Sequence, residues 1–469
     1  MPPIDAPSTL YKLYCSLKKS FDNDVQTVLG QDTPRILIVF LAAVMLSLWL
    51  THPWPGDDLL RDMVSWAYSY DYRKMFIYSP GVPSYNQYIY FDLITGWIYK
   101  TLPYYGHQAG VLLIQTAATA SYLAAVTVSI SRHLKGRSDK WLMTAILLML
   151  ILQCGAGGRL ALARPEIFLS AWAIWATSIT SKSEATAWTV VGLVLIPMYW
   201  LSMVYVPVYL MARRSYAEKI TLSSLLILYG LMFWDAWSGG TFIHTLENTN
   251  HAVETRIIDV SEDSPAFLLF LSWQFDILVL AIISLTYRRL LQGNLTPVSR
   301  EKKVMMAIVI WFFLPGMVRY ADIIAPLLAI AICSLWPKQS PLPWTPWARA
   351  AVALYLILNG FSMFHASAQT TFFHIKDPKE HRVLAPFDSS MYRLIFENPG
   401  IMVAPAMEVG FTEMPIQKMI LSIHNGSLSC ANLSKFTFTD VMENSLTHIP
   451  PCLQLEDVSN TLRLWRVKN

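Results

Sequence analysis

Charged residues are scarce in this sequence. Lys, Arg, Asp and Glu make up 14% of its 469 residues, whereas soluble globular proteins average about 25%. Hydrophobic residues make up 54%. This balance excludes an ordinary soluble domain and predicts a polytopic α-helical membrane protein. The net charge of +4 is small and falls in short linkers, so it indicates membrane orientation rather than nucleic-acid binding.

Cysteine is also rare, and nucleotide-binding and metal-binding motifs are missing. The chain has five cysteines, and Cys15, Cys154 and Cys333 have no metal-ligand spacing. Only Cys430 and Cys452 lie together in a polar region, so we predict a disulfide between them in an oxidising compartment. No P-loop, G-x-G-x-x-G, H-E-x-x-H or G-x-S-x-G occurs in a credible context, and the isolated histidines lack ligand spacing. These absences argue against a nucleotide and against a dedicated zinc site.

Long apolar runs separated by basic linkers predict the topology. Lys12, Lys18 and Lys19 precede the first run, so the positive-inside rule places the segment 1–34 in the cytoplasm. The loop 51–105 then lies outside, and its far end, YNQYIYFDLITGWIYKTLP, predicts a helix in the membrane interface. Together with the hairpin described next, the predicted spans give about 11 transmembrane helices: 36–50, 109–130, 141–154, 167–179, 186–211, 220–233, 266–287, 304–318, 323–336 and 348–364.

Two features complete the predicted architecture. The run 186–211 is flanked by basic linkers on both sides, so we interpret it as a hairpin of two short spans bent near Pro197, because proline breaks the helical ladder. From His365 the composition becomes that of a soluble protein. GIMVAP, MILSIHNG, CLQLED and TLRLWRV predict short strands between turns. We therefore expect a transmembrane domain at 35–364 and a small outer-face α/β domain at 365–469.

Three polar groups from distant parts of the chain fall on the outer rim of this topology. That convergence is the main argument for a functional site. The groups are Asp57 and Asp58 at the start of the first loop, Arg159, Arg164 and Glu166 before the span 167–179, and Arg319, Tyr320 and Asp322 before the span 323–336.

An acid pair beside arginines suits glycosyl transfer from a lipid phosphate. One carboxylate accepts the proton of the attacking hydroxyl, and a guanidinium neutralises the departing phosphate. The residues leave open whether Asp57 or Asp58 is the base. The acids could instead mark a solvated loop, and Arg164 or Arg319 could simply anchor a helix end at the headgroups.

Asp276 is the acid placed within a predicted span, where a charge is costly. It could line a groove for the lipid substrate, or it could be the proton-relay acid of a transporter. A transporter or lipid flippase is therefore the alternative function, although transport predicts functional charges at mid-bilayer and repeated halves. The predicted charges lie at one rim, and no internal repeat is visible.

The motifs GDD after the first span, RPE at 164–166 and RY at 319–320, in this order and on one side, resemble the GT-C superfamily of membrane glycosyltransferases. The similarity covers most of 36–364. It implies a catalytic acid in the first outer loop, an amphipathic helix of that loop along the membrane, and a polyprenyl-phosphate sugar as donor. The resemblance makes Asp57 or Asp58 the base of an inverting transfer. The residues expected to bind the donor phosphate are Arg319, Arg164 and Arg159, and those expected to bind substrate are Glu166, Tyr320, Asp322, Asp276, Tyr85 and His107.

Within that superfamily, the adjacent acids and the small C-terminal domain are most similar to the arabinofuranosyltransferase branch, which includes an enzyme that decorates type IV pilin. This implies D-arabinofuranose as the sugar, and a Ser or Thr of an exported protein such as pilin, or a glycan, as acceptor. The absence of a WWDYG-like motif argues against transfer of a whole oligosaccharide. The expected location is a bacterial inner membrane with a periplasmic C-terminal domain. The sequence identifies no cofactor; a divalent cation could assist the acid pair, but one pair is too few ligands to argue for a permanent site.

Overall fold

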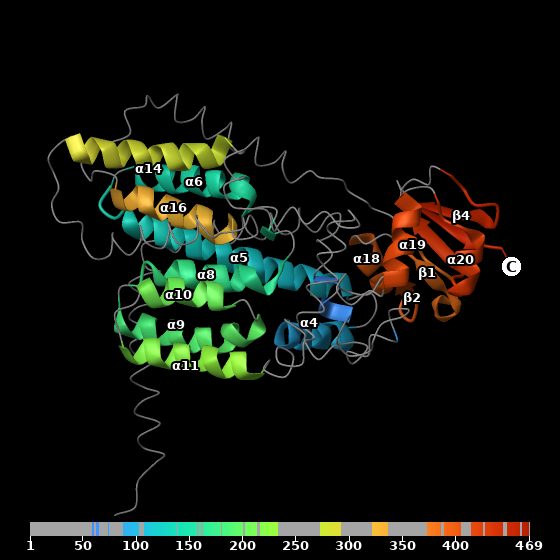
Figure 1. The fold of residues 1–469 in the computed structure, drawn as a ribbon. Coiled ribbons are helices and arrows are strands. Elements are labelled where there is room, and N and C mark those ends of the chain that lie inside the picture. Colours follow the sequence, from blue (N-terminus) through green and yellow to red (C-terminus); the bar gives the residue numbers. More distant parts are fainter. Residues whose placement is uncertain are drawn as a thin grey trace, which may run out of the picture.

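The fold is described from a computed structural model of the chain, drawn in Figure 1. The structure describes residues 59–60, 62–64, 74, 88–102, 107–137, 139–156, 159–160, 163–179, 181–199, 202–212, 216–232, 273–291, 321–335, 373–385, 389–404, 414–424, 427–443, 448–459 and 462–468. The expectations for the spans 36–50, 304–318 and 348–364 lie outside these residues, so the count of about 11 spans stays a prediction.

Helices that run side by side form a bundle at the left of Figure 1. Apolar side chains recur along each helix, and those that face inward form the main hydrophobic core. The helices are α5 (His107–His133), α6 (Lys140–Ile151), α8 (Pro165–Ala176), α9 (Lys182–Leu195), α10 (Ser202–Ala212), α11 (Tyr216–Met232), α14 (Trp273–Leu291) and α16 (Ala321–Leu335), with a π-helical turn, Leu152–Ala156, after α6. Where the predicted spans fall in the described part, they match these helices to within a few residues at most ends.

Helices α5 and α8 lie parallel to each other at the centre of the bundle. Gln115 Nε2 donates to the carbonyl oxygen of Leu160 at 2.5 Å, and Ser129 Oγ donates to that of Ile174 at 3.0 Å. Both contacts join residues 45 positions apart. A constant offset along two segments means that they run in the same direction, so the turn before α8 lies at the end where α5 begins.

The apolar run 186–211 reverses where the sequence predicts. Helix α9 ends in a 3-10 turn, Ile196–Met198, with Pro197 near its start. Helix α10 then returns, and Tyr209 Oη contacts Thr189 Oγ1 at 3.2 Å and donates to the carbonyl oxygen of Ala185 at 3.4 Å. Since these partners lie at similar distances before and after Pro197, α9 and α10 are antiparallel.

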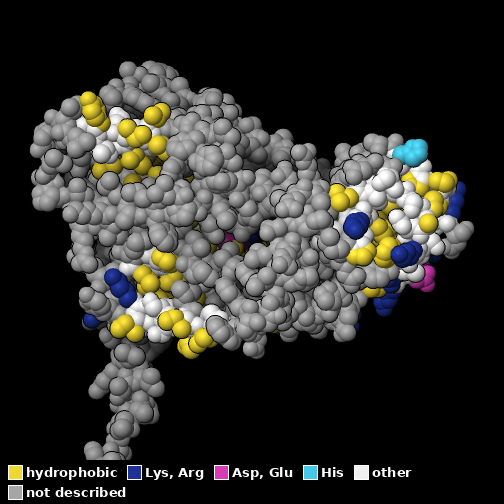
Figure 2. Space-filling model, viewed as in Figure 1, with side chains coloured by type: hydrophobic (Ala, Val, Ile, Leu, Met, Phe, Trp, Pro, Cys, Tyr) yellow, Lys and Arg dark blue, Asp and Glu magenta, His cyan; other side chains and the backbone are white. Residues whose placement is uncertain are grey.

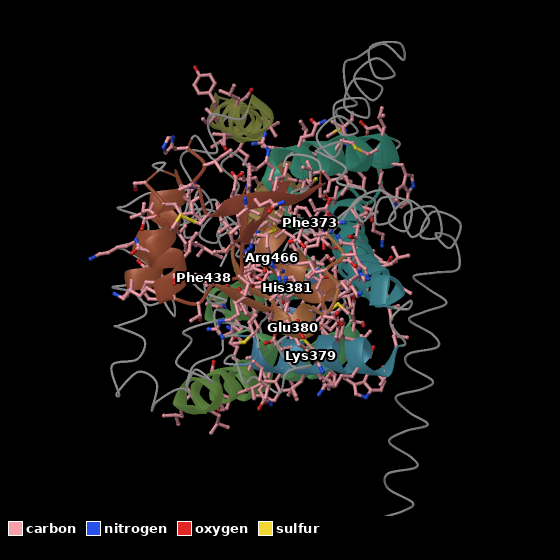
Figure 3. All side chains as sticks on the ribbon, turned by 90° about the vertical axis from the view of Figure 1, so that its right-hand side faces the viewer. Phe373, Lys379, Glu380, His381, Phe438 and Arg466 are labelled. Atoms are coloured by element: carbon pink, nitrogen blue, oxygen red, sulfur yellow. A yellow bond between two sulfur atoms is a disulfide. The ribbon has the colours of Figure 1, made fainter. Side chains whose placement is uncertain are left out.

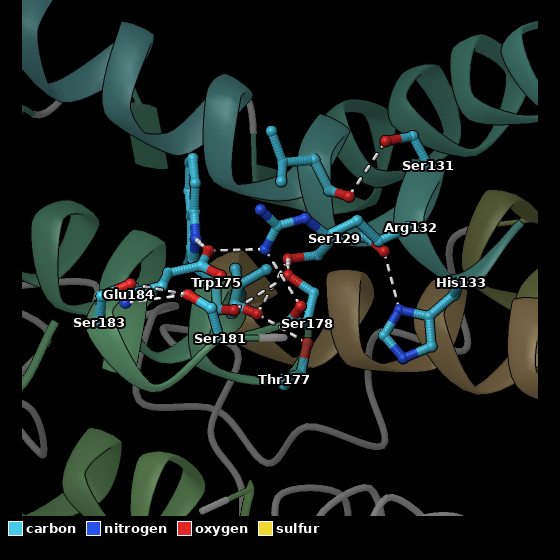
Figure 4. A network of polar contacts seen from close by, with 12 residues as sticks. Ser129, Ser131, Arg132, His133, Trp175, Thr177, Ser178, Ser181, Ser183 and Glu184 are labelled. Carbon is cyan, nitrogen blue, oxygen red and sulfur yellow. Dashed lines mark hydrogen bonds and ion pairs between the residues drawn. The ribbon is translucent and has the colours of Figure 1, made fainter. Parts of the chain in front are cut away.

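A polar network closes the far end of α5, where the chain also turns from α8 into α9 (Figure 4). Arg132 Nη1 pairs with Glu184 Oε1 at 2.6 Å and donates to the carbonyl oxygen of Ser178 at 3.0 Å. Trp175 Nε1 donates to the same Glu184 oxygen at 2.6 Å. These contacts satisfy polar groups at helix ends, which would otherwise be costly to bury. They join the two basic linkers that the sequence places in the cytoplasm.

The outward faces of the bundle are apolar. The most exposed large hydrophobic residues of α9, α11 and α14 include Val194, Ile220 and Leu280, which are 57%, 66% and 61% exposed. Figure 2 shows such side chains in yellow at the upper and lower edges of the bundle. Among the described helices, Ala109–His133 is long and apolar enough to cross a membrane by length and composition. Apolar outer faces of this kind are typical of surfaces that contact lipid or another protein.

Helix α4 (Ile89–Thr101) forms where the sequence predicts an interfacial helix. One face packs on the rest of the protein through Phe91, Asp92, Thr95 and Tyr99, and the opposite face exposes Tyr90, Ile94 and Trp97. The exposed residues recur at helical spacing, so α4 has an apolar face without cover in the described part of the chain. Its position in the membrane interface stays a prediction.

The C-terminal residues form an α/β unit beyond α4, at the right of Figure 1. Its five strands have the order β2-β1-β3-β5-β4. Strands β1, β2 and β3 are parallel, whereas β5 pairs antiparallel with both β3 and β4. The elements are β1 (Arg382–Leu384), α18 (Ser389–Glu397), β2 (Met402–Ala404), α19 (Met414–His424), α20 (Cys430–Lys435), β3 (Asp440–Glu443), β4 (Leu453–Ser459) and β5 (Leu462–Val467).

The two faces of this sheet belong to different cores. Val383 and Leu464 face the core that continues through α18 into the bundle, and Tyr99 of α4 meets Phe396 of α18 with ring centroids 5.3 Å apart. Leu384 and Trp465 face a second core with α19 and α20. Alternation along each strand produces this division, because successive side chains point to opposite faces.

One predicted strand is wrong. The segment MILSIHNG is largely part of helix α19, which begins one residue before Pro415. Its buried residues Ile416, Met419, Ile420 and Ile423 recur at the helical spacing of three and four, a period that a window of eight residues cannot reveal reliably. The predicted pair Cys430 and Cys452 is bonded, with Cα atoms 5.9 Å apart.

Candidate functional site

The turn before α8 brings two of the predicted site residues together. Arg159 Nη2 donates to Glu166 Oε1 at 3.4 Å. Glu166 lies in the first turn of α8, just after Pro165, where the positive end of the helix dipole favours a carboxylate. Buried Ala163 has a φ of 49°, a left-handed conformation that is costly for a residue with a Cβ and is often found at functional sites.

Asp322, from a distant segment of the chain, joins this pair. It lies in the first turn of α16. Ser170 of α8 donates a short hydrogen bond to Asp322 Oδ2, and Tyr122 of α5 donates to the Asp322 carbonyl oxygen at 2.5 Å. Arg159 and Glu166 both act electrostatically on the Asp322 carboxyl group. Helices α5, α8 and α16 and the turn before α8 therefore hold one positive and two acidic side chains in a single cluster.

The cluster is buried. Arg159, Glu166 and Asp322 are 6%, 2% and 0% exposed, so they lie inside the bundle rather than on an open rim. Glu166 Oε2 and Asp322 Oδ1 have no hydrogen-bond partner among the described residues. A buried carboxylate oxygen without a partner is costly. These two oxygens are therefore the carboxylate atoms of the cluster that keep unused hydrogen-bonding capacity.

The acid pair Asp57 and Asp58 lies outside the described residues, but the segment that follows it does not. Leu59, Leu60 and Met63 are buried in the main core. A Cβ on Gly110 would lie 3.4 Å from Met63 Cε, so this segment packs on the first turn of α5. Gln115, one and a half turns further along α5, holds the Leu160 carbonyl about 8 Å away along the helix axis. The residues after the acid pair are thus anchored near the Arg159 turn.

The remaining predicted site residues are placed in part. Arg319, Tyr320 and Tyr85 lie outside the described residues. Arg164 is the half-buried N-cap of α8. The backbones of two more residues are described: His107 begins α5, and Asp276 lies in α14. The structure therefore tests the convergence only for Arg159, Glu166 and Asp322.

Sequence analysis missed three residues that organise the cluster. Ser170, Tyr122 and Gln115 are each 0% exposed and lie within apolar helices. A polar side chain inside an apolar run usually satisfies a neighbour or faces a cavity, so their position carried a signal. The sequence could not indicate their partners, since the contacts from Tyr122 and Ser170 to Asp322 join residues 200 and 152 positions apart.

No set of three or more His, Cys, Asp or Glu side chains suited to a metal ion occurs in the described part of the chain. Glu166 and Asp322 offer carboxylate oxygens of the type that Mg²⁺ and Ca²⁺ prefer, but Ca²⁺ usually takes about six to eight ligands. A divalent cation at this cluster would therefore need ligands beyond these two carboxylates.

Comparison with known proteins finds no matching family model and no matching curated protein sequence. Among solved structures, the apo form of the Archaeoglobus fulgidus oligosaccharyltransferase aligns with a TM-score of 0.44 and 11% identity, over 87% of this chain and 69% of that chain. The same enzyme tethered to an acceptor peptide containing the NVT sequon aligns with a TM-score of 0.43, at the same identity and coverage. Such low scores describe a loose likeness in the arrangement of elements, and we base no argument on them.

Proposed function

We propose that this protein is an inverting membrane glycosyltransferase that takes its sugar from a polyprenyl-phosphate donor. The observation that carries the proposal is the buried cluster of Arg159, Glu166 and Asp322. The sequence predicted that Asp322 converges with Arg159 and Glu166, although Asp322 lies far from these two residues in the chain. Structural ion pairs also cluster inside proteins, but the unpaired oxygens of Glu166 and Asp322 favour a site that meets a substrate.

The proposed reaction uses both signs of charge. Asp57 or Asp58 accepts the proton of an acceptor hydroxyl while its oxygen forms a bond to the anomeric carbon. The bond from that carbon to the phosphate oxygen breaks, and the lipid phosphate leaves with the electron pair. Arg319, three residues before Asp322, neutralises the departing phosphate. A positioned base typically contributes about 10²–10⁴-fold to the rate.

The buried cluster supports this reaction from one side. Arg159 compensates part of the charge of Glu166 and Asp322 and holds the turn next to the anchored segment 59–64. In the sequence, Arg164 is next to the start of α8 and Tyr320 is next to the start of α16. We assign Arg164 to the donor phosphate, and Glu166, Asp322 and Tyr320 to the walls of the substrate site.

The finer assignments rest on the sequence alone. We propose D-arabinofuranose as the sugar and a hydroxyl of an exported protein, such as a pilin Ser or Thr, or of a glycan as acceptor. The proposed location is a bacterial inner membrane, with the first loop and the C-terminal unit in the periplasm. The apolar outer faces of α9, α11 and α14 support placement in a membrane.

A transporter or flippase is less well supported. That alternative rests on Asp276, which lies in α14. Transport also predicts repeated halves, and no internal repeat is visible in the sequence.

Substitution of the acid pair tests the proposed function. Asp57→Asn and Asp58→Asn are assayed singly for transfer from a radiolabelled polyprenyl-phosphate arabinofuranose in detergent. We expect the transfer rate of one variant to be about 10²–10⁴-fold lower, because asparagine cannot accept the proton. Full activity in both variants would contradict the catalytic assignment of the acid pair.

Two controls accompany this assay. Glu456→Gln removes an exposed carboxylate on β4 and should leave transfer unchanged. A reporter fusion at Ser261 should be periplasmic; a cytoplasmic reporter there would overturn the sidedness on which the convergence of the polar groups depends.

A further inference from the structure

A second charged cluster lies in the C-terminal unit, away from the buried bundle site. His381 Nδ1 lies 2.9 Å from Asp440 Oδ2, and Thr439 Oγ1 donates to the same oxygen at 2.5 Å. Arg466 Nη1 donates to Asp440 Oδ1 at 3.3 Å. His381 precedes β1, Asp440 begins β3 and Arg466 lies near the end of β5. The cluster therefore sits at the sheet edge where the parallel strands β1 and β3 start.

This cluster has more hydrogen-bond donors than acceptors, because Asp440 is fully used and Arg466 is not. Asp440 is 0% exposed, and its two oxygens already accept from His381, Thr439 and Arg466. A carboxylate only accepts, so its contact with His381 fixes the proton on Nδ1. The Arg466 side chain, by contrast, is 44% exposed, and its Nε and Nη2 have no partner in the described part of the chain. The guanidinium thus keeps donors directed at solvent after its pairing with Asp440.

Two strained residues flank the cluster. Asp377 and Thr437 have φ values of 53° and 54°; the first lies four residues before His381 and the second three residues before Asp440. A left-handed conformation is unusual for a β-branched residue such as Thr437, where the C-terminal turn of α20 would normally have glycine. Strain of this kind often accompanies binding sites.

We propose that Arg466 binds an oxyanionic group of a ligand, either a carboxylate or a phosphate. The exposed N–H groups of Arg466 match the two oxygens of such a group, and buried Asp440, held in turn by His381, fixes the guanidinium in position. Figure 3, which looks onto the C-terminal end, labels Arg466 and His381. Lys468, two residues after Arg466 and exposed, adds positive charge on the same side of the chain, because alternate residues of an extended strand share a side.

A purely structural role would be to tie β1, β3 and β5 together. Asp440, His381 and Thr439 suffice for that role, since they already join the starts of β1 and β3, and β5 is held by its backbone pairing with β3. The exposed donors of Arg466 contribute nothing to it. The proposal therefore differs from the structural role in one measurable property, the affinity of Arg466 for a free oxyanion.

Calorimetric titration of the full-length protein in an uncharged detergent tests the proposal. Inorganic phosphate and acetate are titrated separately at constant ionic strength and neutral pH. We expect one of them to bind saturably at a site that depends on Arg466, and which one shows this dependence identifies the ligand group as a phosphate or a carboxylate. Arg466→Gln should raise the Kd by about tenfold or more, because bonds to a charged donor are lost.

Arg463→Gln is the matched control. Arg463 is exposed on the same strand and lies opposite Glu443 rather than Asp440, so its substitution should change the Kd by less than about twofold. Saturable binding of neither anion, or an equal Kd in the Arg466→Gln and Arg463→Gln variants, overturns the proposal.

Arg466→Lys is a second test variant that separates a loss of binding from a folding defect. It keeps the charge beside Asp440 but loses the planar fork, so the Kd should rise several-fold while the thermal unfolding midpoint stays close to that of the parent. If Arg466→Gln does not fold, the lysine variant decides: unchanged affinity in a folded Arg466→Lys protein contradicts the proposal. Neither measurement depends on sugar transfer, so this test is independent of the proposed function.

Discussion

Asp322 shows how single polar residues set the energetics inside this bundle. It is completely buried, and a carboxyl group in such a place is tolerated only where donors compensate for lost water. Ser170 supplies one of these donors, and nearby Arg159 supplies opposite charge. Ser170 is therefore a positioning residue for the proposed substrate site, acting through the orientation of Asp322.

We predict that Ser170→Ala lowers both stability and transfer. Removal of the hydroxyl leaves Asp322 Oδ2 without this donor, which should cost about 1–3 kcal/mol of unfolding free energy. Ser334→Ala is the control, because Ser334 Oγ donates only to Ile330 of its own helix α16 and its loss should cost less than about 0.5 kcal/mol. Thermal unfolding in detergent and the transfer rate are measured for both. Equal effects of the two substitutions would argue against a positioning role for Ser170.

At the level of elements, close packing between α8, α9 and α10 depends on one glycine. Trp172 of α8 stacks on Tyr209 of α10 with ring centroids 4.2 Å apart, and its Nε1 donates to the carbonyl oxygen of Trp188 at 2.7 Å. A Cβ on Gly192 would lie 2.6 Å from Trp172 Cζ2. Because both sides hold the indole in place, the ring cannot move away from a larger residue.

Gly192→Ala should therefore destabilise the bundle by about 1–3 kcal/mol, the usual cost of overpacking a core. Gly230→Ala in α11 is the matched control. Among the described residues, no neighbouring atom outside its own helix backbone lies within 4 Å of the position that its Cβ would take, and alanine favours a helix over glycine by about 1 kcal/mol. The thermal unfolding midpoint should fall in Gly192→Ala and should rise or stay unchanged in Gly230→Ala. A loss of stability in Gly230→Ala equal to that in Gly192→Ala would contradict this explanation.

Across the whole molecule, two hydrophobic cores meet at the C-terminal sheet. The larger core passes from the bundle through α18 to one face of the sheet, so the bundle and that face are expected to unfold together. The smaller core, between the other face and α19 and α20, is closed by the disulfide from Cys430 in α20 to Cys452, just before β4. The disulfide therefore stabilises the part of the protein farthest from the bundle.

Reduction of Cys430–Cys452 should destabilise that smaller core. The bonded cysteines are 22 positions apart, and a loop of this length predicts about 3 kcal/mol of stabilisation. Hydrogen exchange of the α20 and β4 amides should accelerate on reduction, whereas the α5 amides should not change. The double variant Cys430→Ser and Cys452→Ser should show the fast exchange with or without reductant. An effect of reductant on that variant would show that another disulfide is responsible.

Much of the local structure follows from the sequence. The helices α5, α6 and α8 could be predicted because long apolar runs between basic linkers have few other stable conformations. Pro197 marked the reversal between α9 and α10, since proline removes a helical hydrogen bond. Helix α19 was missed because a few apolar residues fit either period when the window is short.

The sequence by itself also determined that Arg159 and Glu166 belong together, because they are seven positions apart at one helix start, with Pro165 just before Glu166. Only the tertiary structure decided that Ser170 and Tyr122 hold Asp322, and that His381, Asp440 and Arg466 meet at one sheet edge. Those contacts depend on which faces of distant elements pack against each other. Packing is set by the whole core at once, so no local pattern of residues records it.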